Sequence, residues 1–124
     1  MGIHTQLISG IGIRKFYSVI VNFITGTGNY PNKIGIVWPT DSKAILADNF
    51  EGKPFEAVND LVVDKKDGVY FTLANSGTVL YALPGAKVIK VFADPVERIN
   101  GVTLSRDEKT LYVATQSRAA KTKL

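Results

Sequence analysis

Cysteine is absent from this chain of 124 residues, and histidine, methionine and tryptophan each occur once. Without cysteine there can be no disulfide framework, no thiolate nucleophile and no zinc site with cysteine ligands. A Ser–His–Asp triad would have to use His4, the only histidine. The lack of cysteine, together with the lack of a convincing signal sequence, favours a cytoplasmic protein.

Long apolar runs are also absent. No run approaches the ~20 residues that a membrane-crossing helix needs, so we expect no membrane partner. Residues 14–26, "RKFYSVIVNFITG", place two cations before an apolar run, as a signal peptide does. Asn22 interrupts that run and no cleavage site of small residues follows, so we interpret the segment as a buried strand.

The basic residues are scattered rather than gathered in one place. The formal net charge is +4, from 15 basic and 11 acidic residues, and the densest basic run is Arg118, Lys121 and Lys123. Basic residues do not alternate with clustered aromatics, so no nucleic-acid partner is expected. Two glycine-rich stretches, 9–13 and 26–32, lack the following helix of a phosphate-binding loop, and we interpret both as loops.

One unit of sequence occurs twice. "VNDLVVDKKDGVYFT" begins at residue 58, and "INGVTLSRDEKTLYVAT" begins at residue 99. Each version starts with an aliphatic residue followed by an asparagine, Asn59 or Asn100, and continues through a charged turn to an apolar run that contains a tyrosine. The match extends upstream, where Leu46-Ala47-Asp48 aligns with Phe92-Ala93-Asp94. The aligned positions are 41 to 46 residues apart.

Hydrophobic residues alternate within each unit with the period of two that is typical of a strand with one buried face. We predict strands at 61–64, 68–72, 78–83, 87–92, 102–105 and 110–115. Four short strands in each ~40 to 45 residues indicate a blade of a β-propeller. The alternative is an unrelated series of hairpins that look alike because all strands alternate.

The N-terminal part follows the repeat less closely. Residues 1–27 match it poorly, although strands are predicted within 16–24 and 32–46. We therefore divide the chain into this N-terminal segment, a partial propeller at 28–117 and a basic tail at 118–124.

The segments 45–72 and 93–115, read together, resemble the gluconolactonase and senescence-marker-protein (regucalcin) family of six-bladed β-propellers. The resemblance implies an all-β fold in which this chain supplies about two to three four-stranded antiparallel blades of the ring. It also implies a hydrolase that opens a small-molecule substrate, a sugar (aldono-) lactone. The implied cofactor is a divalent cation, usually calcium, with zinc or magnesium as alternatives.

The resemblance assigns roles to two residues, and proximity to them suggests a role for a third. Asn59 and Asn100 match asparagines that bind the metal in this family, and Asp60 is the nearest carboxylate that could hold a water molecule or accept a proton. Amide oxygens suit a hard cation, which prefers oxygen ligands. The alternative for both asparagines is a turn residue bonded to the local backbone.

Several positions depart from the family pattern. Leu73 and Gln116 stand where an aspartate is common, and Ala57 stands where the regucalcin branch has an arginine. Glu51 and Glu56 do not have the context of the metal-binding glutamate of the first blade. Six blades would need ~250 residues. The chain could therefore be a fragment, an inactive product, or a subunit that completes a ring as a homo-oligomer through open blade edges. The alternative functions are a non-catalytic propeller segment that binds or scaffolds and, less favoured, a metal-independent enzyme of the strictosidine-synthase type.

Overall fold

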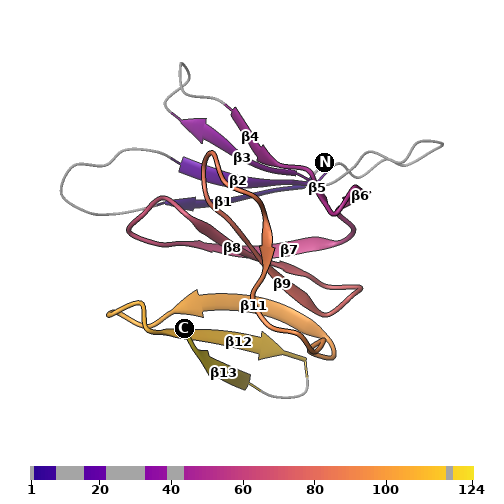
Figure 1. The fold of residues 1–124 in the computed structure, drawn as a ribbon, viewed down its shortest axis with the longest axis vertical. Helices are drawn as coiled ribbons and strands as arrows, with labels where there is room; N and C mark the ends of the chain where they lie inside the picture. Colours follow the sequence, from indigo (N-terminus) through magenta and orange to yellow (C-terminus); the bar gives the residue numbers. More distant parts are fainter. Residues whose placement is uncertain (1, 8–15, 22–32, 39–43, 117–118) are drawn as a thin grey trace.

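The computed structural model describes residues 2–7, 16–21, 33–38, 44–116 and 119–124, and every helix-or-strand element in them is a β-strand. The strands form three larger antiparallel sheets and one short hairpin. Figure 1 shows the three larger sheets one above another, in the order of the chain. The all-β prediction is confirmed. Within the described ranges there is no helix that is long and apolar enough to cross a membrane.

The first sheet is a meander, in which strands that are neighbours in sequence are neighbours in space. Its strands are β1 Gly2–Leu7, β2 Phe16–Val21, β3 Lys33–Trp38 and β4 Ala44–Ala47. The strands predicted within 16–24 and 32–46 are confirmed. The structure adds β1, which lies in the poorly matched residues 1–27. Both glycine-rich stretches lie outside the described residues.

A short hairpin connects the first sheet to the second. It consists of β5 Asn49–Phe50 and β6 Lys53–Pro54. The second sheet is again a meander, made of β7 Val58–Val63, β8 Val69–Leu73, β9 Thr78–Ala82 and β10 Ile89–Lys90. The third sheet contains β11 Ile99–Leu104, β12 Thr110–Thr115 and β13 Ala119–Lys123. Most of the segment that we assigned to a basic tail is thus a strand paired with β12.

The two units seen in the sequence have the same backbone. In the turn between β7 and β8, the Asp64 N–H donates to the Gly68 carbonyl at 2.9 Å, and between β11 and β12 the Ser105 N–H donates to the Thr110 carbonyl at 2.8 Å. Asp67 and Glu108 take the same left-handed position, with φ of 64° and 58°. The second turn accommodates one additional residue, which explains why the offset grows from 41 to 42.

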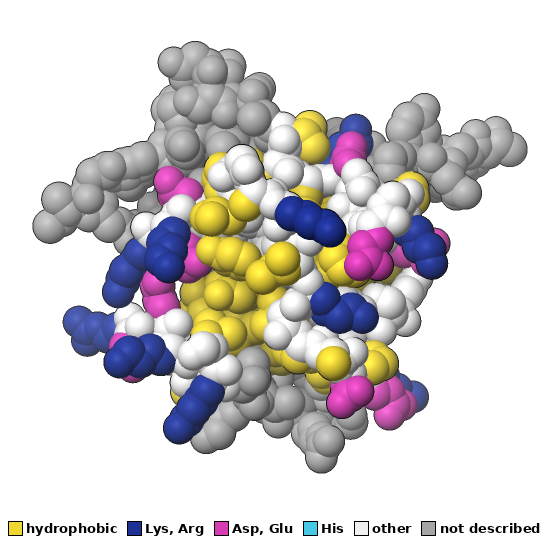
Figure 2. Space-filling model, viewed as in Figure 1, with side chains coloured by type: hydrophobic (Ala, Val, Ile, Leu, Met, Phe, Trp, Pro, Cys, Tyr) yellow, Lys and Arg dark blue, Asp and Glu magenta, His cyan; other side chains and the backbone are white. Residues whose placement is uncertain are grey.

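The hydrophobic core lies between the sheets because alternate side chains of each strand point to opposite faces. One cluster packs the second sheet against the first and includes Ile34, Leu61 and Phe71. The other packs the second sheet against the third and includes Val79 and Leu111. Figure 2 shows hydrophobic side chains gathered over the second sheet and towards β11, with charged side chains around them. The second sheet is therefore the centre of the described structure.

Candidate functional site

Asn59 and Asn100 occupy the same place in their strands. Asn59 is the second residue of β7 and Asn100 is the second residue of β11, and we call these two strands the Asn-headed strands. The register with the next strand shifts between Val58 and Leu61 in the first case, and between Ile99 and Val102 in the second. A shift of this kind is a β-bulge, which bends the strand and changes the direction of a side chain. Both asparagines therefore sit in the first part of an equivalent bulge.

The backbone that leads into each bulge is also repeated. Ala57 and Arg98 have φ of 50° and 55°, in the left-handed region that non-glycine residues rarely adopt. Their carbonyls accept hydrogen bonds from the N–H groups of Ala74 and Gln116, at 2.9 and 3.1 Å. These bonds hold a strained residue in place at the start of each strand. The backbone at the start of β7 thus repeats the backbone at the start of β11.

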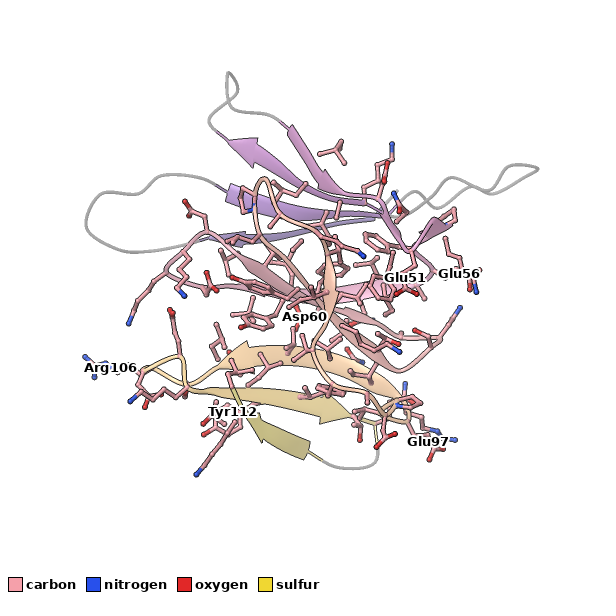
Figure 3. All side chains as sticks on the ribbon, in the orientation of Figure 1. Glu51, Glu56, Asp60, Glu97, Arg106 and Tyr112 are labelled. Atoms are coloured by element: carbon pink, nitrogen blue, oxygen red, sulfur yellow. The ribbon has the colours of Figure 1, made fainter. Side chains whose placement is uncertain are left out.

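Both strands begin at the same end of the molecule. Figure 3 labels Glu56 and Glu97, which precede the two strands at equivalent positions, and both lie on the same side. Arg106, in the turn that follows β11, lies on the opposite side. The repeat therefore brings Asn59 and Asn100 to one end of two neighbouring strands.

Both asparagine side chains are exposed. Within the part of the chain that the structure describes, neither side chain forms a hydrogen bond. The interpretation as turn residues bonded to the local backbone therefore has no support in the described contacts. Their assignment as metal ligands stays a prediction, because no cluster of three or more His, Asp or Glu side chains accompanies them in the described residues.

Asp60 has contacts that tie the second sheet to the third. Its Oδ1 accepts a hydrogen bond from the Leu61 N–H at 2.9 Å, and its Oδ2 accepts one from the Val102 N–H at 3.0 Å. The second bond joins residues 42 apart in the sequence and crosses from β7 to β11. Asp60 is half-buried and fastens the two Asn-headed strands together. Its role as a catalytic group stays a prediction.

Thr72 completes this connection, and sequence reasoning did not single it out. Its side chain is 0% exposed, the only fully buried polar one among the described residues. The hydroxyl donates to the Asn100 carbonyl at 2.8 Å and accepts from the Asp60 N–H at 3.1 Å. One hydroxyl thus bridges the backbones of both bulges. The positions equivalent to Asp60 and Thr72 in the third sheet are Gly101 and Ala114. Polar residues in one repeat against Gly and Ala in the other were the sequence signal that could have identified this pair.

The other end of the second sheet carries a different cluster. The Tyr81 hydroxyl donates to Asp64 Oδ2 at 2.7 Å, and Asp64 Oδ1 accepts from the N–H groups of Lys66 and Gly68, each at 2.8 Å. Burial, followed by the hydrogen bond to Asp64, raises the pKa of Tyr81 well above its ordinary value. The Tyr70 and Tyr81 rings lie 4.4 Å apart. We interpret this cluster as stabilising the turn between β7 and β8 rather than as a site of chemical reaction.

Three acidic residues outside the Asp60–Thr72 connection, Glu51, Glu56 and Asp107, are exposed. Glu51 lies in the turn between β5 and β6 and Glu56 follows β6, so both belong to the connection between sheets. Asp107 is exposed in its turn. The Ser105 hydroxyl, 2.6 Å away, and the Lys109 N–H at 3.1 Å lower the pKa of Asp107.

Comparison with known proteins identifies the family of this chain. A sequence profile for the SMP-30/gluconolactonase/LRE-like region matches residues 22–122. The chain belongs to the SMP-30/gluconolactonase/LRE-like family. This confirms the resemblance seen in the repeated motifs. The match also includes most of β13, which we had placed in the tail.

Curated relatives in this family are lactonases. The lactonase drp35 of Staphylococcus aureus is 32% identical over 98 residues, which make up 73% of this chain and 30% of that protein. The gluconolactonase of Zymomonas mobilis is 31% identical over 96 residues, which make up 65% of this chain and 27% of that protein. The chain thus spans less than a third of the length of these two relatives.

Proposed function

We propose that the three larger sheets are consecutive blades of a β-propeller, part of the six-bladed ring that the family resemblance implies. In each sheet, strands that follow one another in sequence pair with one another. β7 contacts β1 and β2 on one side and β11 on the other. β7 and β11, each the first strand of its sheet, lie side by side, as expected around the axis of a propeller.

Burial at equivalent positions supports the same arrangement. Val62 and Thr72 of the second sheet are buried beneath the third sheet. Their equivalents in the third sheet, Thr103 and Ala114, are exposed, and Tyr112 is 44% exposed. Each sheet therefore covers the face of the sheet before it, as stacked repeats do.

We infer that the chain contributes to the metal-assisted opening of sugar (aldono-) lactones, with Asn59 and Asn100 as metal ligands. The observation that carries this proposal is the repeated bulge, which presents an exposed asparagine at the same end of two strands that Asp60 and Thr72 hold together. Fixing the backbone of a ligand reduces the conformational freedom that is lost when the metal binds.

The amide oxygens of Asn59 and Asn100 are the type of ligand that such a cation prefers, but two of them do not complete its coordination shell. Calcium takes about six to eight oxygen ligands, and its affinity rises with the number of charged ligands. Two neutral amides would supply part of that shell, and water or carboxylates from further blades would supply the rest. A bound divalent cation would supply Lewis-acid polarisation of the lactone carbonyl. Asp60, next to Asn59, is the carboxylate that we propose to hold the attacking water molecule.

The test combines a calcium titration by calorimetry with hydrolysis of glucono-1,5-lactone in a pH-stat. Asn59→Ala and Asn100→Ala should each weaken calcium binding about tenfold, since each removes one ligand. Asn75→Ala, which removes an exposed asparagine from the loop after β8, should leave binding unchanged. Unchanged calcium affinity in both ligand variants would refute the site.

A non-catalytic propeller segment is the second candidate. It is favoured by Leu73 and Gln116 at positions where the family commonly has aspartate, and by the two backbone N–H groups that already occupy Asp60. Calcium binding without lactone hydrolysis above the rate of a metal-free control would support this candidate. Hydrolysis that is lost in Asn100→Ala would exclude it.

Association through open sheet edges stays a prediction. Within the described residues, β13 pairs with β12 alone and leaves its other edge open to another strand. Sedimentation equilibrium should give a mass above 13.5 kDa for such an assembly. A monomer mass at all concentrations would exclude it.

A further inference from the structure

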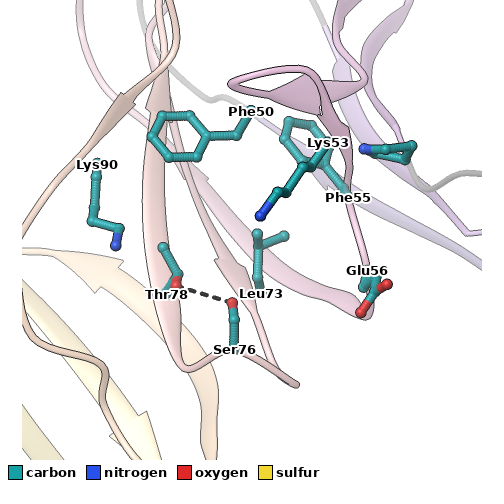
Figure 4. A pocket seen from close by; sticks show the side chains of 9 residues that line it. Phe50, Lys53, Phe55, Glu56, Leu73, Ser76, Thr78 and Lys90 are labelled. Carbon is teal, nitrogen blue, oxygen red and sulfur yellow. Dashed lines mark hydrogen bonds between the residues drawn. The ribbon is translucent and has the colours of Figure 1, made fainter.

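A pocket of about 280 Å³ opens beside the hairpin of β5 and β6, and neither Asn59 nor Asn100 is part of its lining. Its lining comes from three places: the hairpin and the residues that follow it, the end of β8 and the start of β9 with the loop between them, and β10. Figure 4 shows Phe50, Phe55 and Leu73 around the space and Lys53 and Lys90 at two of its sides. No role has been assigned to this pocket by the repeated motifs or by the proposed lactonase site.

The apolar wall of the pocket is firmly held. Phe55 is 2% exposed and Leu73 is 9% exposed, and both belong to the core between the first two sheets. The Phe55 ring contacts the buried Phe71 ring edge to face, with 5.1 Å between the ring centres. A wall of packed core residues keeps its shape when the pocket is empty, which favours binding of a hydrocarbon group.

Two lysine side chains from different strands line the pocket. Lys53 belongs to β6 and Lys90 belongs to β10, and Figure 4 shows both ammonium groups turned toward the space around Leu73 and Thr78. Among the described residues, neither lysine forms an ion pair. Glu56 lies at the margin opposite Lys90. Both ammonium groups therefore face the pocket, next to its apolar wall.

The hydroxyls of Ser76 and Thr78 lie on the same part of the wall as the lysines, and the Ser76 hydroxyl donates to Thr78 Oγ1 at 2.9 Å. The Thr78 hydroxyl can donate its own proton to an acceptor in the pocket. Two ammonium groups and a hydroxyl are donors that suit an oxygen anion, and the apolar wall suits a hydrocarbon body.

We propose that this pocket binds a small organic carboxylate, with its charged end between Lys53 and Lys90 and its hydrocarbon part against Phe50, Phe55 and Leu73. A volume of 280 Å³ is that of roughly nine water molecules. The ligand therefore has about ten non-hydrogen atoms. The apolar wall favours a carboxylate with a hydrocarbon body over inorganic phosphate, and the proposal does not depend on lactonase activity.

The test uses sodium 3-phenylpropanoate as the probe and the ¹⁵N-labelled chain observed by NMR. The probe should bind saturably with a Kd on the order of 1 mM, as expected for a ligand of this size. The amide signals of Phe55, Leu73 and Thr78 should shift. The neutral 3-phenylpropanamide, which has the same shape, should bind at least about fivefold more weakly because it lacks the charge.

Variants distinguish binding by Lys53 and Lys90 from a general attraction of the anionic probe to a basic protein. Lys53→Gln and Lys90→Gln should each weaken binding about fivefold. Lys87→Gln is the matched control, because Lys87 is exposed, lies close to β10 and is not part of the pocket lining. Equal binding of the amide, equal weakening by Lys87→Gln, or shifts confined to other residues would each overturn the proposal. So would the absence of saturable binding at concentrations of about 10 mM.

Discussion

The substitution Thr72→Val tests the connection between the two Asn-headed strands. Valine has the shape of threonine and retains the packing, but it removes the hydroxyl that lies 2.8 Å from the Asn100 carbonyl and 3.1 Å from the Asp60 nitrogen. Two backbone groups then lose their partner at a site where the side chain is 0% exposed. Each unsatisfied buried group costs about 1–3 kcal/mol, so for two groups we expect a loss of roughly 2–6 kcal/mol of unfolding free energy.

That loss is large beside the total stability of a small domain, which is about 5–15 kcal/mol. It should lower the Tm by roughly 10 °C in a chain of this size. Urea unfolding followed by circular dichroism gives the free energy, and the m-value shows whether the unfolding reaction is otherwise unchanged.

Two further variants serve as controls for Thr72→Val. Thr72→Ser keeps the hydroxyl and should recover most of the loss. Thr103→Val makes the same chemical change at an exposed position of β11 and should alter stability by less than about 0.5 kcal/mol. The interpretation of Thr72 as a bridge is wrong if Thr72→Val is no more destabilising than Thr103→Val.

Three other predictions concern the second sheet. Gly68→Ala should destabilise the chain by about 2 kcal/mol in urea unfolding, because the new Cβ would overlap the Tyr81 hydroxyl and break its bond to Asp64. A stability equal to wild type would contradict this. Gly77→Ala should be similarly harmful, since Gly77 has φ of +67° and its Cβ would lie 2.5 Å from the carbonyl oxygen of Val96, and full stability would exclude that contact. The folded-state pKa of Tyr81 is raised above 10.0, so the Tyr81–Asp64 bond stabilises the fold fully below pH 10.0 and this contribution is lost as the pH rises above it. Tyr81→Phe should therefore flatten the fall in stability above pH 10.0, and an unchanged pH profile would contradict it.

The alternation of apolar residues predicted most of the strands. β12 coincides with the predicted segment 110–115, and the other repeat strands overlap their predictions. The predicted strand at 87–92 shortens to Ile89–Lys90, the part that pairs with Leu80 and Tyr81 of β9. As the last strand of its sheet it has one neighbour, and Ile89 is 52% exposed, so little burial extends it.

The candidate site was only partly predictable. The repeat located Asn59 and Asn100, because equivalent positions in a repeat occupy equivalent places in space. It could not reveal the bulges, which depend on register, nor the bond from Asp60 to Val102, which joins residues 42 apart. Proximity to Asn59 suggested a catalytic role for Asp60, and the structure adds that its carboxylate accepts hydrogen bonds from backbone N–H groups of both strands.

The central proposal is that Asn59 and Asn100 bind the same cation. Calcium titration of the ¹⁵N-labelled chain, followed through the side-chain NH₂ signals of asparagine, tests it most directly. We expect the Asn59 and Asn100 signals to shift together with one Kd, on the order of 1 mM for such a partial ligand set, while Asn75 does not move. Shifts with different Kd values, a shift of only one of the two signals, or an equal response of Asn75 would contradict a shared site.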